Sequence, residues 1–198
     1  MTAFVHETRS SVSRYEGPIF SVVTDEVTMS SGGTARRDVV HNKGAVGVVA
    51  LDEVGRVVLI KQYRHAVGQR LWELPAGLRD VSGEGLAVTA ARELAEEADL
   101  RAGSFHLLID LYTSPGFADE TIRIFLARDL TPVPEAERYE RTDEEADLEI
   151  AWIDLDEAVA MVFRGEITNA AAVGGLLAAA RARDEGWATL RPADTPAI

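Results

Sequence analysis

Three glutamates lie close together in the sequence, at spacings that let their side chains share one partner. Glu93 lies three residues before Glu96 and four before Glu97, within a run of strong helix formers at 86–98. At about 3.6 residues per turn, the three carboxylates project from one side of a helix. Their repulsion destabilises a helix by roughly a few tenths of a kcal/mol per pair, and a bound cation would offset it. Oxygen ligands alone favour a hard ion, Mg²⁺ or Mn²⁺.

A solvated acidic helix face explains such a cluster equally well when residues 92–97 are taken alone. The flanking residues extend the pattern, because Gly77 lies fifteen residues before Arg92 and Glu84 lies eight before it. The whole pattern is G-x6-E-x7-R-E-L-x-E-E-x-D-L. It resembles the Nudix box, the signature of the Nudix hydrolases, whose usual form is G-x5-E-x7-R-E-U-x-E-E-x-G-U with U a bulky aliphatic residue.

Two departures from the usual box can be read in the sequence. One additional residue separates Gly77 from Glu84, which a loop can absorb. Asp99 stands where the family has glycine. We expect a left-handed backbone at that position, just after a helix, and Asp tolerates this conformation better than most residues. Neither departure changes the helix carboxylates.

The resemblance covers about residues 43–183 and implies an α/β fold, an α/β/α sandwich around a mixed sheet. It also implies a Mg²⁺ cofactor, with Mn²⁺ as a possible substitute. The roles that it implies are metal ligation by Glu93 and Glu97, assistance by Glu96, a further ligand in the backbone carbonyl of Ala76, support from Gly77 and Glu84, and orientation of a glutamate by Arg92 through a salt bridge.

Three features are similar to the ADP-ribose pyrophosphatase branch of this family. Residues 62–77 read QYRHAVGQRLWELPAG, like the lead-in to the box in that branch. Ser114, Pro115 and Gly116 follow the box at the branch's spacing. The third feature is an additional N-terminal β section, which this branch exchanges between the subunits of a homodimer. The resemblance therefore implies hydrolysis of the nucleoside diphosphate ADP-ribose to AMP and ribose 5-phosphate.

Within that branch, the resemblance implies that side chains outside the box bind the substrate. Arg64 is the candidate for gripping the phosphates or the terminal ribose, because its planar fork suits phosphate; a surface salt bridge is the alternative. Arg37 could reach the neighbouring subunit's site. Tyr63 and Trp72 could stack on adenine, but core or interface packing is the favoured interpretation of both.

The attacking water needs a general base, which this branch supplies from a loop before a late strand. The matching segment here is 143–147, where the resemblance makes Glu144 the first candidate and Glu145 the second. An acid-rich loop is otherwise an ordinary solvated turn.

The elements around these residues can be outlined from their composition. Strands are expected at 18–27, before residue 40, and at 45–51, 56–64, 105–112, 121–130 and 147–154; helices are expected at 86–98, 155–164 and 168–183. Because strands and helices do not alternate strictly, we expect a mixed sheet. The expected organisation is an antiparallel β section at 1–42, a main domain at 43–185 and a loosely ordered tail at 186–198.

Composition limits the remaining classes of function. The 198 residues carry a formal net charge of −13 and no cysteine, which excludes thiolate metal sites and argues against a nucleic-acid partner. No signal peptide or membrane segment is expected, so we expect a cytoplasmic protein. Two alternatives stay open: hydrolysis of another nucleoside diphosphate sugar, such as GDP-mannose, or of a dinucleotide; and a non-catalytic nucleotide-binding module, which would be expected to lose box glutamates that are present here.

Overall fold

The computed structural model describes residues 4–81, 83–141 and 147–198. The chain forms two compact units. Unit 1 comprises residues 1–44 and 112–121, and unit 2 comprises residues 45–111 and 122–198. In the described part of the chain, no helix has both the length and the apolar character needed to cross a membrane.

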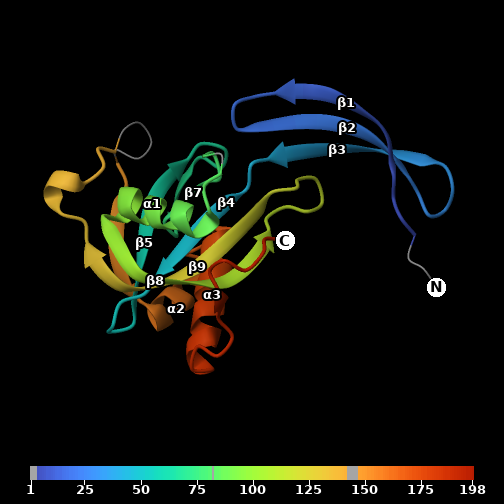
Figure 1. Cartoon of the computed structure of the whole chain (residues 1–198). Helices are drawn as coiled ribbons and strands as arrows, with labels where there is room; N and C mark the ends of the chain where they lie inside the picture. The colour runs from blue at the N-terminus through green and yellow to red at the C-terminus, as the bar shows by residue number, and fades with distance from the viewer. Residues whose placement is uncertain (1–3, 82, 142–146) are drawn as a thin grey trace. The chain divides into compact units, whose positions relative to one another are not determined.

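Unit 1 is built on a three-stranded antiparallel sheet, drawn in blue in Figure 1. Its strands are β1 (Thr8–Glu16), β2 (Phe20–Thr28) and β3 (Thr34–Asn42). The segment 112–121 joins this unit through backbone bonds: Val40 N–H donates to Phe117 O at 2.8 Å, and Asp119 N–H donates to Val40 O at 3.1 Å. A stretch far along the chain therefore packs with the N-terminal strands, which the sequence did not predict.

The described residues of unit 2 form two sheets and three α-helices. The five-stranded sheet has the order β11-β8-β9-β4-β7, and the three-stranded sheet has the order β10-β5-β6. Strand β4 pairs in parallel with β9 and antiparallel with β7, so the prediction of a mixed sheet is confirmed. The elements are β4 (Ala45–Ala50), β5 (Arg56–Arg64), β6 (Gln69–Glu73), β7 (Ala76–Leu78), α1 (Leu86–Ala98), β8 (Leu100–Tyr112), β9 (Thr121–Pro132), a 3₁₀ turn (Glu135–Glu137), β10 (Glu149–Asp154), α2 (Leu155–Phe163), α3 (Ala170–Asp184) and β11 (Arg191–Pro192).

Two core clusters separate the helices of unit 2 into layers. Val46 and Val48 of β4 pack with Leu94 of α1, whereas Val49 packs with Leu155 of α2 and Leu176 of α3. This division follows from the alternation of side chains along a strand, and it places α1 on the opposite side of the strands from α2 and α3 (Figure 1). The layers agree with the predicted α/β/α sandwich.

The C-terminal residues of unit 2 make specific bonds. Strand β11 pairs with β8, and the buried guanidinium of Arg123 donates to Thr195 O at 2.5 Å and to Pro196 O at 2.9 Å. Arg123 also pairs with Asp110 at 2.7 Å. The stretch that composition suggested to be loosely ordered is thus connected to the core by a buried cation.

Candidate metal centre

Helix α1 holds the glutamates of the box. It begins after Gly85 and ends at Asp99, which has φ 54° and ψ 36°. The left-handed conformation expected of Asp99 is therefore confirmed. Arg141 secures this end of the helix, because its Nε donates to Glu96 O at 2.9 Å and its guanidinium pairs with Asp99 at 2.8 Å.

Glu93 and Glu97 lie on the buried stripe of α1, in line with Ala90 and Leu94. Only 9% of Glu93 and 4% of Glu97 is exposed. Buried carboxylates need a compensating charge or several hydrogen bonds. A merely solvated acidic face, the alternative that the sequence left open, does not fit this degree of burial.

Strand β7 approaches these carboxylates directly. The backbone N–H of Ala76 donates to Glu97 Oε2 at 2.7 Å. At Gly77, a Cβ atom would lie 2.1 Å from Glu93 Cδ and 2.2 Å from its Oε1. The glycine of the box is therefore required by close approach of a carboxylate, because any side chain would occupy the space that Glu93 fills.

Arg92 is surrounded by four carboxylates. Its guanidinium lies 2.7 Å from Glu93 and 3.0 Å from Glu96. It lies 3.5 Å from Glu84 and 3.6 Å from Asp80. Glu84 also accepts a hydrogen bond from the hydroxyl of Thr89 at 2.9 Å. The structure thus brings Arg92, Glu84, Glu93 and Glu96 together.

The carboxylates around Arg92 outnumber its single positive charge, and the pKa values of both Glu93 and Arg92 are raised. Burial raises the pKa of Glu93 to about 7; nearby Arg92 opposes the shift, and the charge of Glu96 adds to it. Burial disfavours the charged form of Arg92, but the charges of Glu93 and Glu96 outweigh it, so the pKa of Arg92 is raised. One guanidinium among four carboxylates leaves excess negative charge, which a proton or a further cation would neutralise.

A hard divalent cation fits this donor set. Among the described residues, no three Asp, Glu, His or Cys side chains already converge as a ligand group. The reason is visible in the bonds: Arg92 holds Glu93 and Glu96, and the Ala76 N–H holds Glu97. The remaining acids proposed from the sequence, Glu144 and Glu145, lie outside the described residues.

Arg64 lies at the end of β5, on the strand that carries the QYR sequence. Its guanidinium makes a two-pronged contact with the buried carboxylate of Glu73, from Nε to Oε1 at 2.9 Å and from Nη2 to Oε2 at 2.7 Å. Tyr63 is exposed, and Trp72 lies under the Lys61 ammonium, 5.1 Å from the ring centroid. The salt bridge considered for Arg64 is present, and its other member is the buried Glu73 of the same unit.

The other predicted substrate residues belong to unit 1. Arg37 lies on β3 and donates to the carbonyl of Arg36 at 2.8 Å. Ser114, Pro115 and Gly116 form a turn, in which Ser114 O accepts from the N–H groups of Phe117 at 3.1 Å and Ala118 at 2.9 Å. The predicted site residues are therefore divided between the two units.

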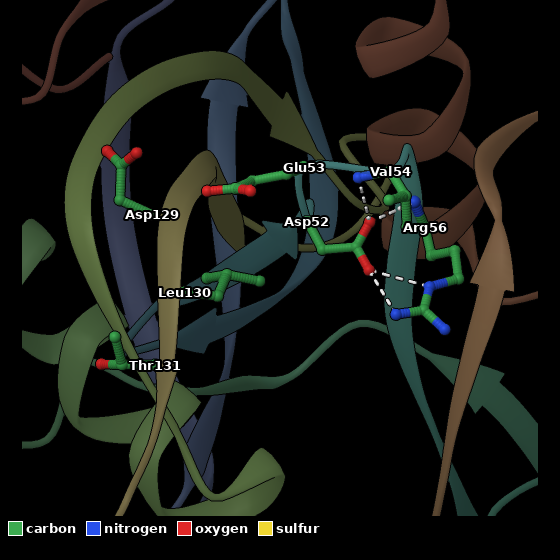
Figure 2. A pocket seen from close by; sticks show the side chains of 7 residues that line it. All are labelled: Asp52, Glu53, Val54, Arg56, Asp129, Leu130 and Thr131. Carbon is green, nitrogen blue, oxygen red and sulfur yellow. Dashed lines mark hydrogen bonds and ion pairs between the residues drawn. The ribbon is translucent and has the colours of Figure 1, made fainter.

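A cavity of about 510 Å³ in unit 2 does not involve the predicted site residues. It is lined by Asp52, Glu53, Val54, Arg56, Asp129, Leu130 and Thr131. Figure 2 shows that Asp52 is already occupied, since it accepts from Arg56 and from the N–H of Val54. We place the chemistry at α1, because the buried carboxylates lie there.

Three residues that hold the predicted site residues in place were not singled out from the sequence. Glu73 and Arg141 are separated in sequence from the groups they bind, so only the fold reveals their partners. Asp80 lies within the box interval that is one residue longer than usual, and that irregularity was the one available signal for it.

Comparison with known proteins defines the class. The family model described as NUDIX domain matches residues 41–172, and the chain belongs to this family. An ADP-ribose pyrophosphatase of Mycobacterium tuberculosis is 48% identical over 96% of this chain and 89% of its own length. One of Bacillus subtilis is 31% identical over 86% of this chain and 90% of its own length. A solved structure described as an ADP compounds hydrolase shares the fold, with a TM-score of 0.77 and 21% identity, covering 94% of this chain and 98% of that one.

Proposed function

We propose that this protein hydrolyses the diphosphate bond of ADP-ribose, giving AMP and ribose 5-phosphate, and that it requires Mg²⁺, for which Mn²⁺ can substitute. The observation that carries the proposal is the pair of buried carboxylates, Glu93 and Glu97, held on α1 against the backbone of β7. The 48% identity to a protein named ADP-ribose pyrophosphatase, over nearly the whole of both chains, supports the choice of substrate.

In this proposal the box glutamates and one backbone carbonyl bind the metal, and Arg92 orients the glutamates. Glu93 and Glu97, assisted by Glu96 and by the carbonyl of Ala76, would hold the divalent ions. When bound, these ions neutralise the substrate's phosphates and acidify a water molecule. Arg92 keeps the glutamates oriented through its contacts with Glu93 and Glu96. An acidic enzyme can thus accept an anionic substrate, because its carboxylates act on the substrate through cations.

Arg64 is proposed to grip the substrate's phosphates or its terminal ribose. Arg37 is proposed to reach the site of the neighbouring subunit, and Ser114, Pro115 and Gly116 are proposed as further substrate contacts. In the chemical step, water forms a bond to one phosphorus as the bridging P–O bond breaks, and a carboxylate takes the proton from the water.

We assign proton removal to Glu144, with Glu145 as the alternative. Glu144→Gln is expected to lower kcat by about 10²–10⁴-fold, the usual contribution of a positioned base, while Mn²⁺ affinity stays near that of the wild type. The measurement is initial rates of AMP release, alongside a Mn²⁺ titration of each variant. A fast Glu144→Gln beside a slow Glu145→Gln would move the assignment by one residue.

We also propose a homodimer. Every residue of β1 is exposed, including the large apolar side chains of Val12 and Tyr15, and exposed apolar side chains that gather on one element favour a protein–protein interface. Light scattering at micromolar concentration is expected to give about twice the mass of 21.5 kDa for one chain. A mass equal to that of a single chain would contradict the proposal.

A substrate panel tests the function itself. Initial rates with ADP-ribose, GDP-mannose and a dinucleotide, each with Mg²⁺ and with EDTA, are expected to be highest for ADP-ribose and abolished by EDTA. A higher rate for another substrate would place the enzyme in the alternative class of nucleoside diphosphate hydrolases. Binding of ADP-ribose without metal-dependent turnover would identify a non-catalytic binding module.

A further inference from the structure

A cationic hairpin stands out in this acidic chain. Residues 61–70 of the β5–β6 hairpin include Lys61, Arg64 and Arg70 and no acid, although the chain's formal net charge is −13. Carboxylates outside the segment pair with both arginines, Glu73 with Arg64 at 2.7 Å and Glu149 with Arg70 at 3.2 Å. The proposed function brings a diphosphate to this unit, so the way the hairpin fixes its arginines bears on how the substrate is held.

The contact between Arg64 and Glu73 spans a long distance along the ladder. Glu73 is paired with Ile60, whereas Arg64 is paired with Gln69. Ile60 and Arg64 are four residues apart, about 13 Å at 3.3 Å per residue. The two side chains must therefore extend toward each other along the strands, which fixes the direction of the guanidinium.

Gln62 lies between these two positions on the same face of β5, since side chains alternate along a strand. It is 5% exposed, and its Oε1 has no hydrogen-bond partner among the described residues. A buried amide oxygen without a partner is costly, and strain, a functional role, or a bound water or ion accounts for such groups in native proteins. The Arg64–Glu73 pair thus spans a buried polar position that has capacity for another donor.

This face of β5 is the one that packs on α1. Val58, which shares the face with Gln62 and Arg64, lies in the same core cluster as Ala90 and Leu94 of α1. In addition, Glu73 is only three residues before Ala76, whose N–H donates to Glu97. Arg64 therefore projects from the face of β5 that packs on α1, the helix of Glu93 and Glu97. Residues 73–76 connect the partner of Arg64 to the backbone group that binds Glu97.

We propose that Glu73 is a positioning residue, whose buried carboxylate holds the Arg64 guanidinium over Gln62 for contact with the substrate's phosphates. The side chain of Glu73 is 4% exposed and that of Arg64 is 43% exposed, so the pair has one fixed partner and one accessible partner. A two-pronged carboxylate contact restricts the planar guanidinium, which lowers the entropy lost when an anion binds. This inference rests on the proposed function for the identity of the anion.

The test is a double-mutant cycle on Glu73 and Arg64. Glu73→Gln is expected to raise KM for ADP-ribose about tenfold and to change kcat by less than about twofold, because substrate binding and not bond cleavage is affected. Adding Glu73→Gln to Arg64→Ala is expected to have no further effect on KM. Glu157→Gln is the matched control, since it removes one charge from the exposed Arg164–Glu157 pair on α2.

A second variant covers the case in which Glu73→Gln fails to fold. Arg64→Lys keeps a cation opposite the buried carboxylate but cannot make the two-pronged contact, and it is expected to raise KM as much as Glu73→Gln. Wild-type KM in either folded variant, or additive effects in the double variant, would overturn the inference.

Calorimetric titration of ADP-ribose in EDTA separates this inference from the proposed function. Weaker binding by Glu73→Gln and Arg64→Lys than by the wild type is expected without any turnover. If the wild type binds ADP-ribose but releases no AMP with Mg²⁺, the proposed function fails while the positioning role is still tested. Equal binding by the variants and the wild type would overturn the positioning role alone.

Discussion

Glu93→Gln is expected to lower kcat/KM for ADP-ribose on the order of 10²–10³-fold, because the proposed mechanism makes Glu93 a ligand to the cations that stabilise the transition state. The substitution preserves the shape of a side chain that lies against Gly77, so the fold is expected to persist. The measurement is AMP release across a range of Mg²⁺ concentrations. Glu137→Gln is the control, since it removes one charge from the exposed Arg101–Glu137 pair.

Without metal, Glu93→Gln is also expected to change the pH dependence of thermal stability. Burial raises the pKa of Glu93 from 4.5 to about 7, so the folded state binds this proton more tightly than the unfolded state does. The stability of the wild type in EDTA therefore falls as pH rises from about 4.5 to about 7. In thermal unfolding, Glu93→Gln is expected to gain in Tm relative to the wild type between pH 5 and pH 8. A Tm difference that is independent of pH would contradict the account of Glu93.

Gly77→Ala is expected to lower kcat/KM by about 10²-fold while leaving the protein folded. The added Cβ would lie 2.1 Å from Glu93 Cδ. The atoms that must move are the end of a flexible side chain, so the carboxylate is displaced before the backbone is. Such a displacement of about 1 Å or more is costly to a positioned catalytic group.

Gly47→Ala is the matched control for this effect. Gly47 lies on β4, paired with Ala76, and its added Cβ would meet only ordinary contacts, the nearest at 3.6 Å. We expect Gly47→Ala to retain most of the activity. Equal activity in Gly77→Ala and the wild type would show that Glu93 is not needed at its present position.

The strongly patterned elements were predictable from the sequence. Helix α1 spans residues 86–98, as its composition predicted, because Ala, Leu, Glu and Arg dominate this stretch and it contains no Gly or Pro. Strands β4 and β5 were also predicted, since their apolar runs are long and bounded by a turn. Strands β6 and β7 were missed, because five and three residues carry too little periodicity to be distinguished from a loop.

Contacts between residues distant in the chain could not be predicted from the sequence. The box pattern indicated that Glu93 and Glu97 act together, but their burial depends on β7, which lies outside the helix. The partner of Arg64 depends on the β5–β6 register, and the association of residues 112–121 with unit 1 depends on backbone bonds to Val40. None of these contacts leaves a repeating pattern in the chain.

The most direct test of the central claim is a Mn²⁺ titration followed by electron paramagnetic resonance, because the signal of the unbound ion disappears on binding. We expect the wild type to bind Mn²⁺ saturably and to release it to excess Mg²⁺. We expect the double variant Glu93→Gln/Glu97→Gln to leave the ion in solution at the same concentrations. If the double variant binds Mn²⁺ as tightly as the wild type, the buried glutamates of α1 are not the metal centre.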